Sequence, residues 1–201
     1  MKNIIEVSTN LFGEPSEKIL KRDPVYNKIE KEKREEMIET AVSMGTEMAR
    51  KIFADGKWKE SDTLSEYLEK IGITKKHINK DFLLNGIRYC ADIAPKRKEI
   101  LMYEKSIEIW AKEQGYSLKD AHNFILIHEI YHYLEYDNNQ FASAAYQVPM
   151  VKIGKFSIGK TGIRALEEIA ANAFAEEICK ICGLEKKRED WNCGKAMWLT
   201  D

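Results

Sequence analysis

A histidine-containing stretch interrupts an otherwise apolar segment in the second half of the chain. The segment Asn123–Leu134 reads NFILIHEIYHYL, and its only ionisable residues besides two tyrosines are His128, Glu129 and His132. A segment this apolar belongs in a protein core, and we predict that it forms a buried helix. The fold must then give two imidazoles and a carboxylate polar partners inside that core.

His128 and His132 are four residues apart, which is about one turn of helix. Side chains at this spacing lie on one face, so both imidazoles can reach a single metal ion. Glu129 lies on the flank of that face, where it can contact a water on the metal without binding the metal itself. This His-Glu-x-x-His arrangement is typical of zinc-dependent hydrolases. The alternative is a core helix whose histidines are satisfied by protein neighbours and hold no metal.

A catalytic zinc site needs a third protein ligand, and the predicted helix Ile163–Cys182 can supply it. Glu168 and Asn172 are one turn apart on this helix, and alanines on the same face allow close packing against the histidine helix. We expect Glu168 to complete the site and Asn172 to hydrogen-bond a histidine ligand. Glu167 is the rival third ligand, and the glutamates here also fit an ordinary solvated helix surface.

The composition is that of a globular protein without a strong charge bias. The chain has 201 residues, 44% of them hydrophobic, and 32 Lys and Arg against 33 Asp and Glu give a net charge of -1. With no basic stripe or acidic tail, we expect no direct binding to nucleic acid or membranes. We recognise no signal peptide and no apolar run long enough to cross a membrane, and therefore expect a cytoplasmic protein.

Three of the four cysteines lie late in the chain. Cys179 and Cys182 form a C-x-x-C, ten residues separate Cys182 from Cys193, and Cys90 stands apart. We expect reduced thiols, because a metal site here would lack an evident fourth ligand. A structural metal or a redox role for the late cluster is the alternative.

The pattern of the chain predicts an irregular, loosely held arm at 1–24, a helical N-terminal region at 25–85 and a catalytic region at 86–201. The elements expected in the helical region are a helix over Tyr26–Ala54, a second helix capped by Thr63 and Glu66, and a turn through Ile78, Phe82 and Leu83. The elements expected in the catalytic region are a hairpin of Gly86–Ala94 with Glu99–Tyr103, a helix over Lys105–Gln114, the histidine helix capped by Ser117 and Asp120, one strand near Met150–Ile158, and the helix Ile163–Cys182 capped by Thr161.

The stretch EIAANAFAEEI, at Glu168–Ile178, combined with the upstream HEIYH, resembles the ImmA/IrrE family of zinc metallopeptidases. That family pairs the zinc motif with a downstream E-x-x-A-N-x-F-A segment, and this register assigns its glutamate ligand to Glu168. The resemblance implies an α+β fold with a zincin-like (gluzincin-like) core, in which a small sheet packs on the motif helix. Two features depart from the pattern: the long separation of His132 from Glu168, and the ending after Ile178.

The resemblance also implies an activity. It is that of a zinc-dependent endopeptidase in which Glu129 takes a proton from a zinc-bound water, and it acts on a regulatory protein such as a helix-turn-helix repressor. An edge strand of the sheet, expected at Glu99–Tyr103, would bind the extended substrate, with Tyr103 as a substrate-binding residue. The candidates to stabilise the oxyanion are Tyr103, Tyr136, Tyr146 and Arg164. The alternative function is a non-catalytic or latent protein of the same fold that senses or regulates a partner.

Overall fold

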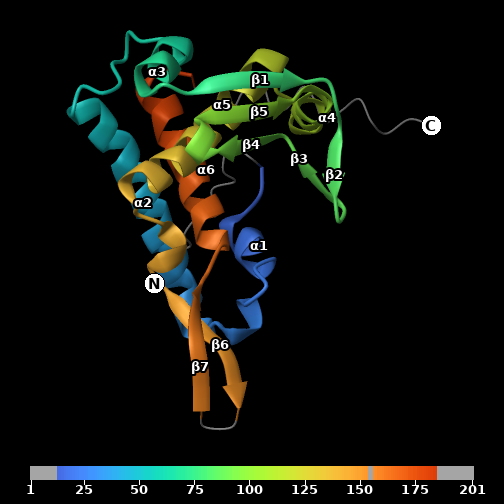
Figure 1. The fold of residues 1–201 in the computed structure, drawn as a ribbon, viewed down its shortest axis with the longest axis vertical. Helices are drawn as coiled ribbons and strands as arrows, with labels where there is room; N and C mark the ends of the chain where they lie inside the picture. The colour runs from blue at the N-terminus through green and yellow to red at the C-terminus, as the bar shows by residue number, and fades with distance from the viewer. Residues whose placement is uncertain (1–12, 154–155, 185–201) are drawn as a thin grey trace, which may run out of the picture.

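A computed structural model describes residues 13–153 and 156–184 of the chain and shows an α+β fold (Figure 1). The helices are α1 (Ser16–Lys21), α2 (Arg34–Ala54), α3 (Leu64–Ile71), α4 (Glu104–Gln114), α5 (Leu118–Asn138) and α6 (Ala165–Ile181). The strands are β1 (Thr74–Ile78), β2 (Phe82–Leu84), β3 (Ile87–Tyr89), β4 (Ala91–Ala94), β5 (Glu99–Tyr103), β6 (Gln147–Ile153) and β7 (Phe156–Gly162). The predicted α+β class is confirmed.

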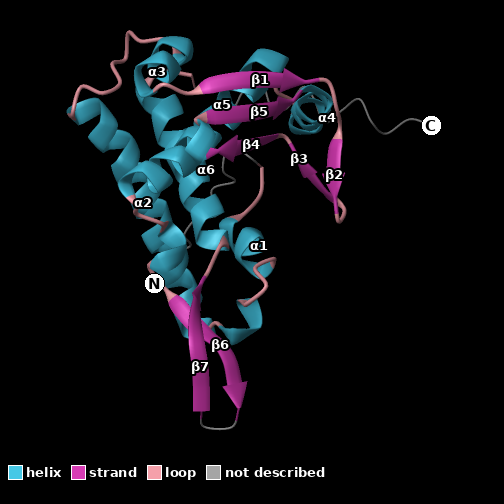
Figure 2. Cartoon of the chain, in the orientation of Figure 1, coloured by secondary structure: helices cyan, strands magenta, loops and turns pink. Residues whose placement is uncertain are grey.

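A three-stranded sheet with the order β1–β5–β4 lies at one end of the molecule (Figure 2). β5 is the middle strand, parallel to β1 and antiparallel to β4. The predicted hairpin is confirmed where β4 and β5 pair, and the turn between them holds Lys98 at a φ of 49°. Ile100 and Met102 alternate along β5 and are fully buried, as expected for one face of a covered strand.

The histidine helix α5 packs against β4 on one side and against α6 on another. The Ser117 hydroxyl caps it by accepting a hydrogen bond from the backbone N–H of Asp120 at 3.1 Å, as predicted. The helix ends at Asn138, and the following Asn139, its C-cap, adopts the left-handed conformation. Most of its middle is buried, including Phe124 and Ile130. The apolar segment therefore lies in the core, as its sequence indicates.

α2 and α6 cross in close contact, and a glycine makes this possible. A Cβ built on Gly45 of α2 would lie 2.0 Å from the backbone oxygen of Ala170 in α6, far inside any allowed contact. Fully buried Ala41, Ala49 and Ala171 continue the small-residue interface. The long helix of the N-terminal region therefore supports the helix that carries Glu168.

The second half of the N-terminal arm, residues 13–24, contains a helix and is held in the core, which corrects the prediction of an irregular, loosely held arm for these residues. α1 buries Ile19 and Leu20 in the main core. Asp23 is also buried, and its Oδ2 accepts the backbone N–H of Ala165 at 2.8 Å, at the first turn of α6. Residues 1–12 of the predicted arm lie outside the described residues.

Two helix starts differ from the prediction. Tyr26–Lys28 and Lys31–Lys33 form separate 3-10 turns, because Ile29 and Glu30 between them are extended. The Arg34 guanidinium lies 4.0 Å over the Tyr26 ring and donates to the Ile29 carbonyl. α2 therefore begins only at Arg34. Thr161 does not cap α6 but lies in β7, where it pairs with Val148 of β6, and the cap comes instead from Asp23, a residue distant in sequence. The capping box of Thr63 is confirmed in full.

Other segments predicted as turns or single strands form paired strands. Ile78 ends β1, while Phe82 and Leu83 belong to β2, which pairs with β3 in a hairpin. The region around Met150–Ile158 forms the β6–β7 hairpin instead of one strand, and it extends from the far end of the molecule (Figure 1). Within the described residues, no helix is long and apolar enough to cross a membrane.

Candidate metal centre

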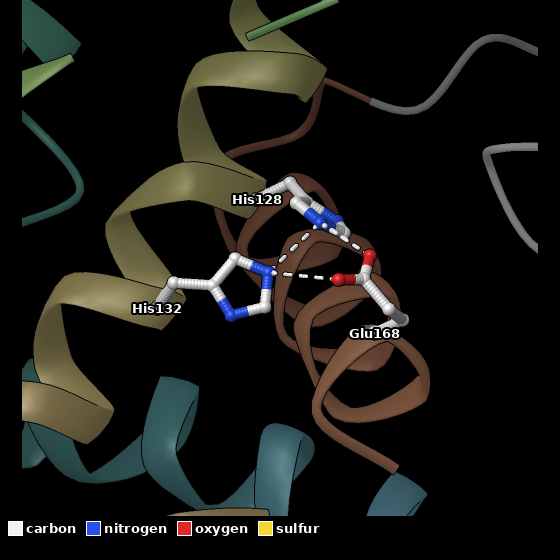
Figure 3. Close-up of side chains that lie close together, drawn as sticks. All are labelled: His128, His132 and Glu168. Atoms are coloured by element: carbon white, nitrogen blue, oxygen red, sulfur yellow. Dashed lines mark hydrogen bonds and ion pairs between the residues drawn. The ribbon is translucent and has the colours of Figure 1, made fainter. Parts of the chain in front are cut away.

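Two imidazoles from α5 and one carboxylate from α6 converge at the interface of these helices. The Nε2 atoms of His128 and His132 are 3.2 Å apart. Glu168 places its Oε2 3.3 Å from Nε2 of His128 and its Oε1 3.7 Å from Nε2 of His132. Figure 3 shows the three side chains pointing toward one another from their two helices.

This spacing suits a tetrahedral metal ion. Ligands about 2.0–2.1 Å from zinc lie about 3.3 Å from each other along the edges of a tetrahedron. The two Nε2 atoms are 3.2 Å apart, and Oε2 and Oε1 of Glu168 lie 3.3 Å and 3.7 Å from His128 and His132 respectively, near that value. One ligand atom from each residue lies within 4.8 Å of the other two. His128, His132 and Glu168 could therefore hold a metal ion with a fourth position open.

Each histidine also has a partner on its other ring nitrogen. The buried Asn172 places Oδ1 2.9 Å from Nδ1 of His128, one turn after Glu168 on the same helix. Nδ1 donates to this oxygen, so the lone pair of Nε2 points into the cluster. The structure therefore places Asn172 where a ligand-orienting residue is expected.

The second partner was not predicted from the sequence. Glu135 is 1% exposed, and its Oε2 lies 3.4 Å from Nδ1 of His132, while its Oε1 accepts the backbone N–H of Ala142 at 2.7 Å. A signal for it exists in the sequence, because a glutamate three residues after His132 lies within reach of that ring on a helix. Its position beside a buried apolar stretch is the additional clue.

Glu129 is nearly buried beside the cluster, at 8% exposure. Burial raises the pKa of its carboxyl, the neighbouring His128 and His132 lower it, and the charges of Glu168 and Asp92 raise it again, with a net upward shift. A carboxylate with a raised pKa is a stronger proton acceptor near neutral pH. Its environment therefore favours uptake of a proton beside the cluster.

The pKa shifts of Glu168 and His132 both favour the charged form of the group. Burial opposes ionisation of Glu168, yet the hydrogen bond from His128 and the charge of His132 lower its pKa to about 2. Burial likewise lowers the pKa of His132, but Glu135 and the charges of Glu168 and Glu129 outweigh this and raise it to about 9. Glu168 remains 55% exposed, so solvent reaches the cluster from its side.

Glu167, the rival ligand, lies outside this cluster. It is half-buried and makes a side-chain hydrogen bond with Ser143, while burial raises its pKa. The structure thus brings Glu168, and not Glu167, to the two histidines. Among the described residues, Cys179 and Cys182 form no group with metal-ligand spacing, and both carry thiols; Cys193 lies outside the described residues.

The four residues considered for the oxyanion lie in different surroundings. Tyr103 is buried at the end of β5, and burial followed by the charges of Asp92 and Glu129 raises its pKa. The Tyr146 hydroxyl donates to Glu36 of α2 at 2.9 Å, which engages it away from the histidines. Tyr136 and Arg164 are exposed.

The expected position of the substrate-binding edge strand is wrong. β5 (Glu99–Tyr103) has strands on both sides, so its backbone groups are already paired. β4 is the edge strand of this sheet that contacts α5. The charge of Asp92, the second residue of β4, contributes to the raised pKa of Glu129. Among the described strands, the sheet edge next to α5 is therefore β4, Ala91–Ala94.

No protein-family model matches the chain, and neither a curated protein nor a solved structure shows significant similarity to it. The fold and the site together define an α+β protein with a histidine, histidine and glutamate cluster that could hold a metal ion.

Proposed function

We propose that this protein is a zinc-dependent metallo-endopeptidase with a zincin-like core of the ImmA/IrrE type. The observation that supports this most is the convergence of His128, His132 and Glu168, whose ring nitrogens and carboxylate oxygens lie 3.2, 3.3 and 3.7 Å apart in pairs, near the edge length of a tetrahedral zinc site. A buried glutamate with a raised pKa adjoins them. A site that served structure alone would have no use for that base.

In the proposed reaction the metal ligands, Glu129 and Asn172 have different roles. A zinc ion held by the three ligands would supply Lewis acidity and make water more acidic. Glu129 would take the proton of the attacking water and return it to the leaving amine of the peptide. Asn172 holds the ring of His128 so that Nε2 faces the ion.

The substrate would bind along β4. The backbone groups on the outer side of an edge strand can pair with an extended peptide without strong sequence demands. β4 contacts α5 and lies beside Glu129, so a peptide paired there would pass the cluster. By resemblance, the proposed substrate is a regulatory protein such as a helix-turn-helix repressor.

The test compares two variants that each remove one carboxylate. Glu129→Gln should keep zinc but cut cleavage of a proteome-derived peptide library about 10²- to 10⁴-fold, because the general base is lost. Glu177→Gln removes the partner of Arg50 elsewhere on α6 and should leave cleavage unchanged. Retained cleavage in Glu129→Gln would show that this residue is not the base. A wild-type protein that binds zinc but cleaves no peptide would support the sensor alternative.

A further inference from the structure

Glu135 is the most deeply buried carboxylate described near the cluster, and each of its two oxygens contacts a nitrogen of the protein. It lies on α5, three residues after His132, and is 1% exposed. Burying a charged carboxylate is costly unless donors meet its oxygens. Here the backbone N–H of Ala142 donates to Oε1 at 2.7 Å, and Nδ1 of His132 lies 3.4 Å from Oε2.

The contact of Glu135 with Ala142 holds the backbone, whereas its contact with His132 orients a ring of the cluster. The contact with Ala142 is a short, buried bond to the backbone that begins the 3-10 turn after α5. The contact with His132 is longer but falls on the ring nitrogen that faces away from the cluster. It mirrors the contact of Asn172 with His128, so each imidazole has its own acceptor on Nδ1.

The turn held by Glu135 also reaches the helix that carries the third donor. The backbone oxygen of Ser143 accepts the N–H of Ile163 at 3.0 Å, just before α6 begins. Ser143 also shares a side-chain hydrogen bond with Glu167, the neighbour of Glu168. A continuous polar path therefore runs from His132 through residues 142–144 to the first turn of α6.

We propose that Glu135 is the positioning residue of the metal centre: it holds His132 with its proton on Nδ1 and ties that ligand to the turn that locates Glu168. The inference rests on the proposed zinc site. An outer carboxylate that accepts the second N–H of a histidine fixes the tautomer and orientation of the ring and makes it a better ligand. Without this acceptor, the proton of the neutral His132 ring could move to Nε2 and compete with the metal for that nitrogen.

One substitution separates this role from a merely structural one. In Glu135→Gln the Ala142 N–H still needs an acceptor, so the amide oxygen is expected to stay there and the amide NH2 to face His132. Nδ1 of His132 must then accept, which moves its proton to Nε2, the metal-binding nitrogen. Glu135→Ala, in contrast, removes both contacts.

The experiment measures zinc affinity by chelator competition and thermal stability of the zinc-free protein. Glu135→Gln should weaken zinc binding about 10- to 100-fold with little change in thermal stability, whereas Glu135→Ala should lower both. Glu177→Gln is the matched control and should change neither. Wild-type zinc affinity in Glu135→Gln would overturn the proposal and leave the zinc site itself intact.

A second measurement uses only the wild-type protein and so does not depend on the variants folding. In the zinc-loaded protein, nitrogen-15 spectra of the imidazoles should show His132 bound through Nε2, with a slowly exchanging proton on Nδ1. Binding through Nδ1, or a freely exchanging proton there, would overturn the role of Glu135. A wild-type protein that binds no zinc would overturn both this inference and the proposed function.

Discussion

The side-chain oxygen of Asn172 lies 2.9 Å from Nδ1 of His128 and joins the two helices of the cluster. Asn172 is buried, so water cannot replace this acceptor easily. Because Glu168 is one turn before Asn172, a single face of α6 both contributes a donor atom and orients the imidazole opposite to it.

Asn172→Ala should therefore weaken zinc binding about 10- to 100-fold, since the ring of His128 loses the acceptor that fixes its tautomer. Chelator competition measures the effect. Asn138→Ala is the control: it removes an amide that donates only to the Leu134 carbonyl at the end of α5, and zinc affinity should not change. Equal affinities in the two variants would contradict the role of Asn172.

Zinc affinity should depend on pH through His132. Glu135, Glu168 and Glu129 outweigh the effect of burial and raise the pKa of this imidazole to about 9 in the metal-free protein. Below that pH a zinc ion must displace a proton, so affinity should rise about tenfold per unit from about pH 7 to about 9 and then level off. The pKa of Glu168 is about 2, so its carboxylate stays charged throughout.

Calorimetry at pH 7 in buffers of different ionisation enthalpy should count about one proton released from His132 per zinc bound. An affinity that stays constant over this pH range, with no proton release, would mean that His132 is already neutral when zinc arrives.

Asp23 should affect the metal site from a distance. It accepts the N–H of Ala165 at the start of α6, and Glu168 lies in that first turn. Asp23→Ala should cost about 0.5–2 kcal/mol of stability, as for other lost caps, and should also weaken zinc binding. Glu17→Ala on the exposed side of α1 is the control, with a change within about 0.5 kcal/mol. Chemical denaturation measures the stability of both variants, and chelator competition measures their zinc affinity.

One hypothesis is that the N-terminal arm occupies the substrate-binding site and keeps the enzyme latent, and the role of Asp23 determines which deletion can test it. Deleting residues 1–24 would remove the cap and the buried Ile19 and Leu20, so a loss of activity would be uninformative. Deleting residues 1–12 keeps these contacts. If the arm keeps the enzyme latent, peptide cleavage should increase in the shorter deletion, and unchanged cleavage would exclude latency by residues 1–12.

Gly45→Ala should destabilise the protein through the crossing of α2 and α6. The added Cβ would meet the backbone oxygen of Ala170, which cannot rotate away as a side chain could. The helices must separate, at a cost of about 1–3 kcal/mol in line with other overpacked cores. Ser43→Ala on the exposed side of α2 is the control. Equal melting temperatures for the two variants would contradict the close crossing.

The sequence predicts best where one local pattern carries the information. The apolar run around His128 and the cap at Ser117 locate α5, and the spacing of Glu168 and Asn172 selects the face of α6 that meets the histidines. These features depend only on the helical period and on end signals. For this reason the histidine pair could be predicted from the sequence pattern, while the register of the family resemblance favoured Glu168 over Glu167 as the third ligand.

The features that escaped prediction depend on contacts between distant parts of the chain. β1 is polar along most of its length and becomes a strand only because β5 pairs with it in parallel. That pairing makes β5 a central strand and moves the free edge to β4. Asp23 caps a helix that begins 142 residues later. No periodicity within a segment encodes such pairings.

The most direct test of the metal centre is the zinc content of the purified protein, measured by elemental analysis together with zinc-edge X-ray absorption. The wild type should hold one zinc per chain, with two histidine nitrogens at about 2.0–2.1 Å and oxygen ligands completing the shell. His128→Ala and Glu168→Ala should each lose most of it, while Glu129→Gln keeps it. A wild-type protein without zinc after exposure to the metal, or with equal zinc in Glu168→Ala, would contradict the account.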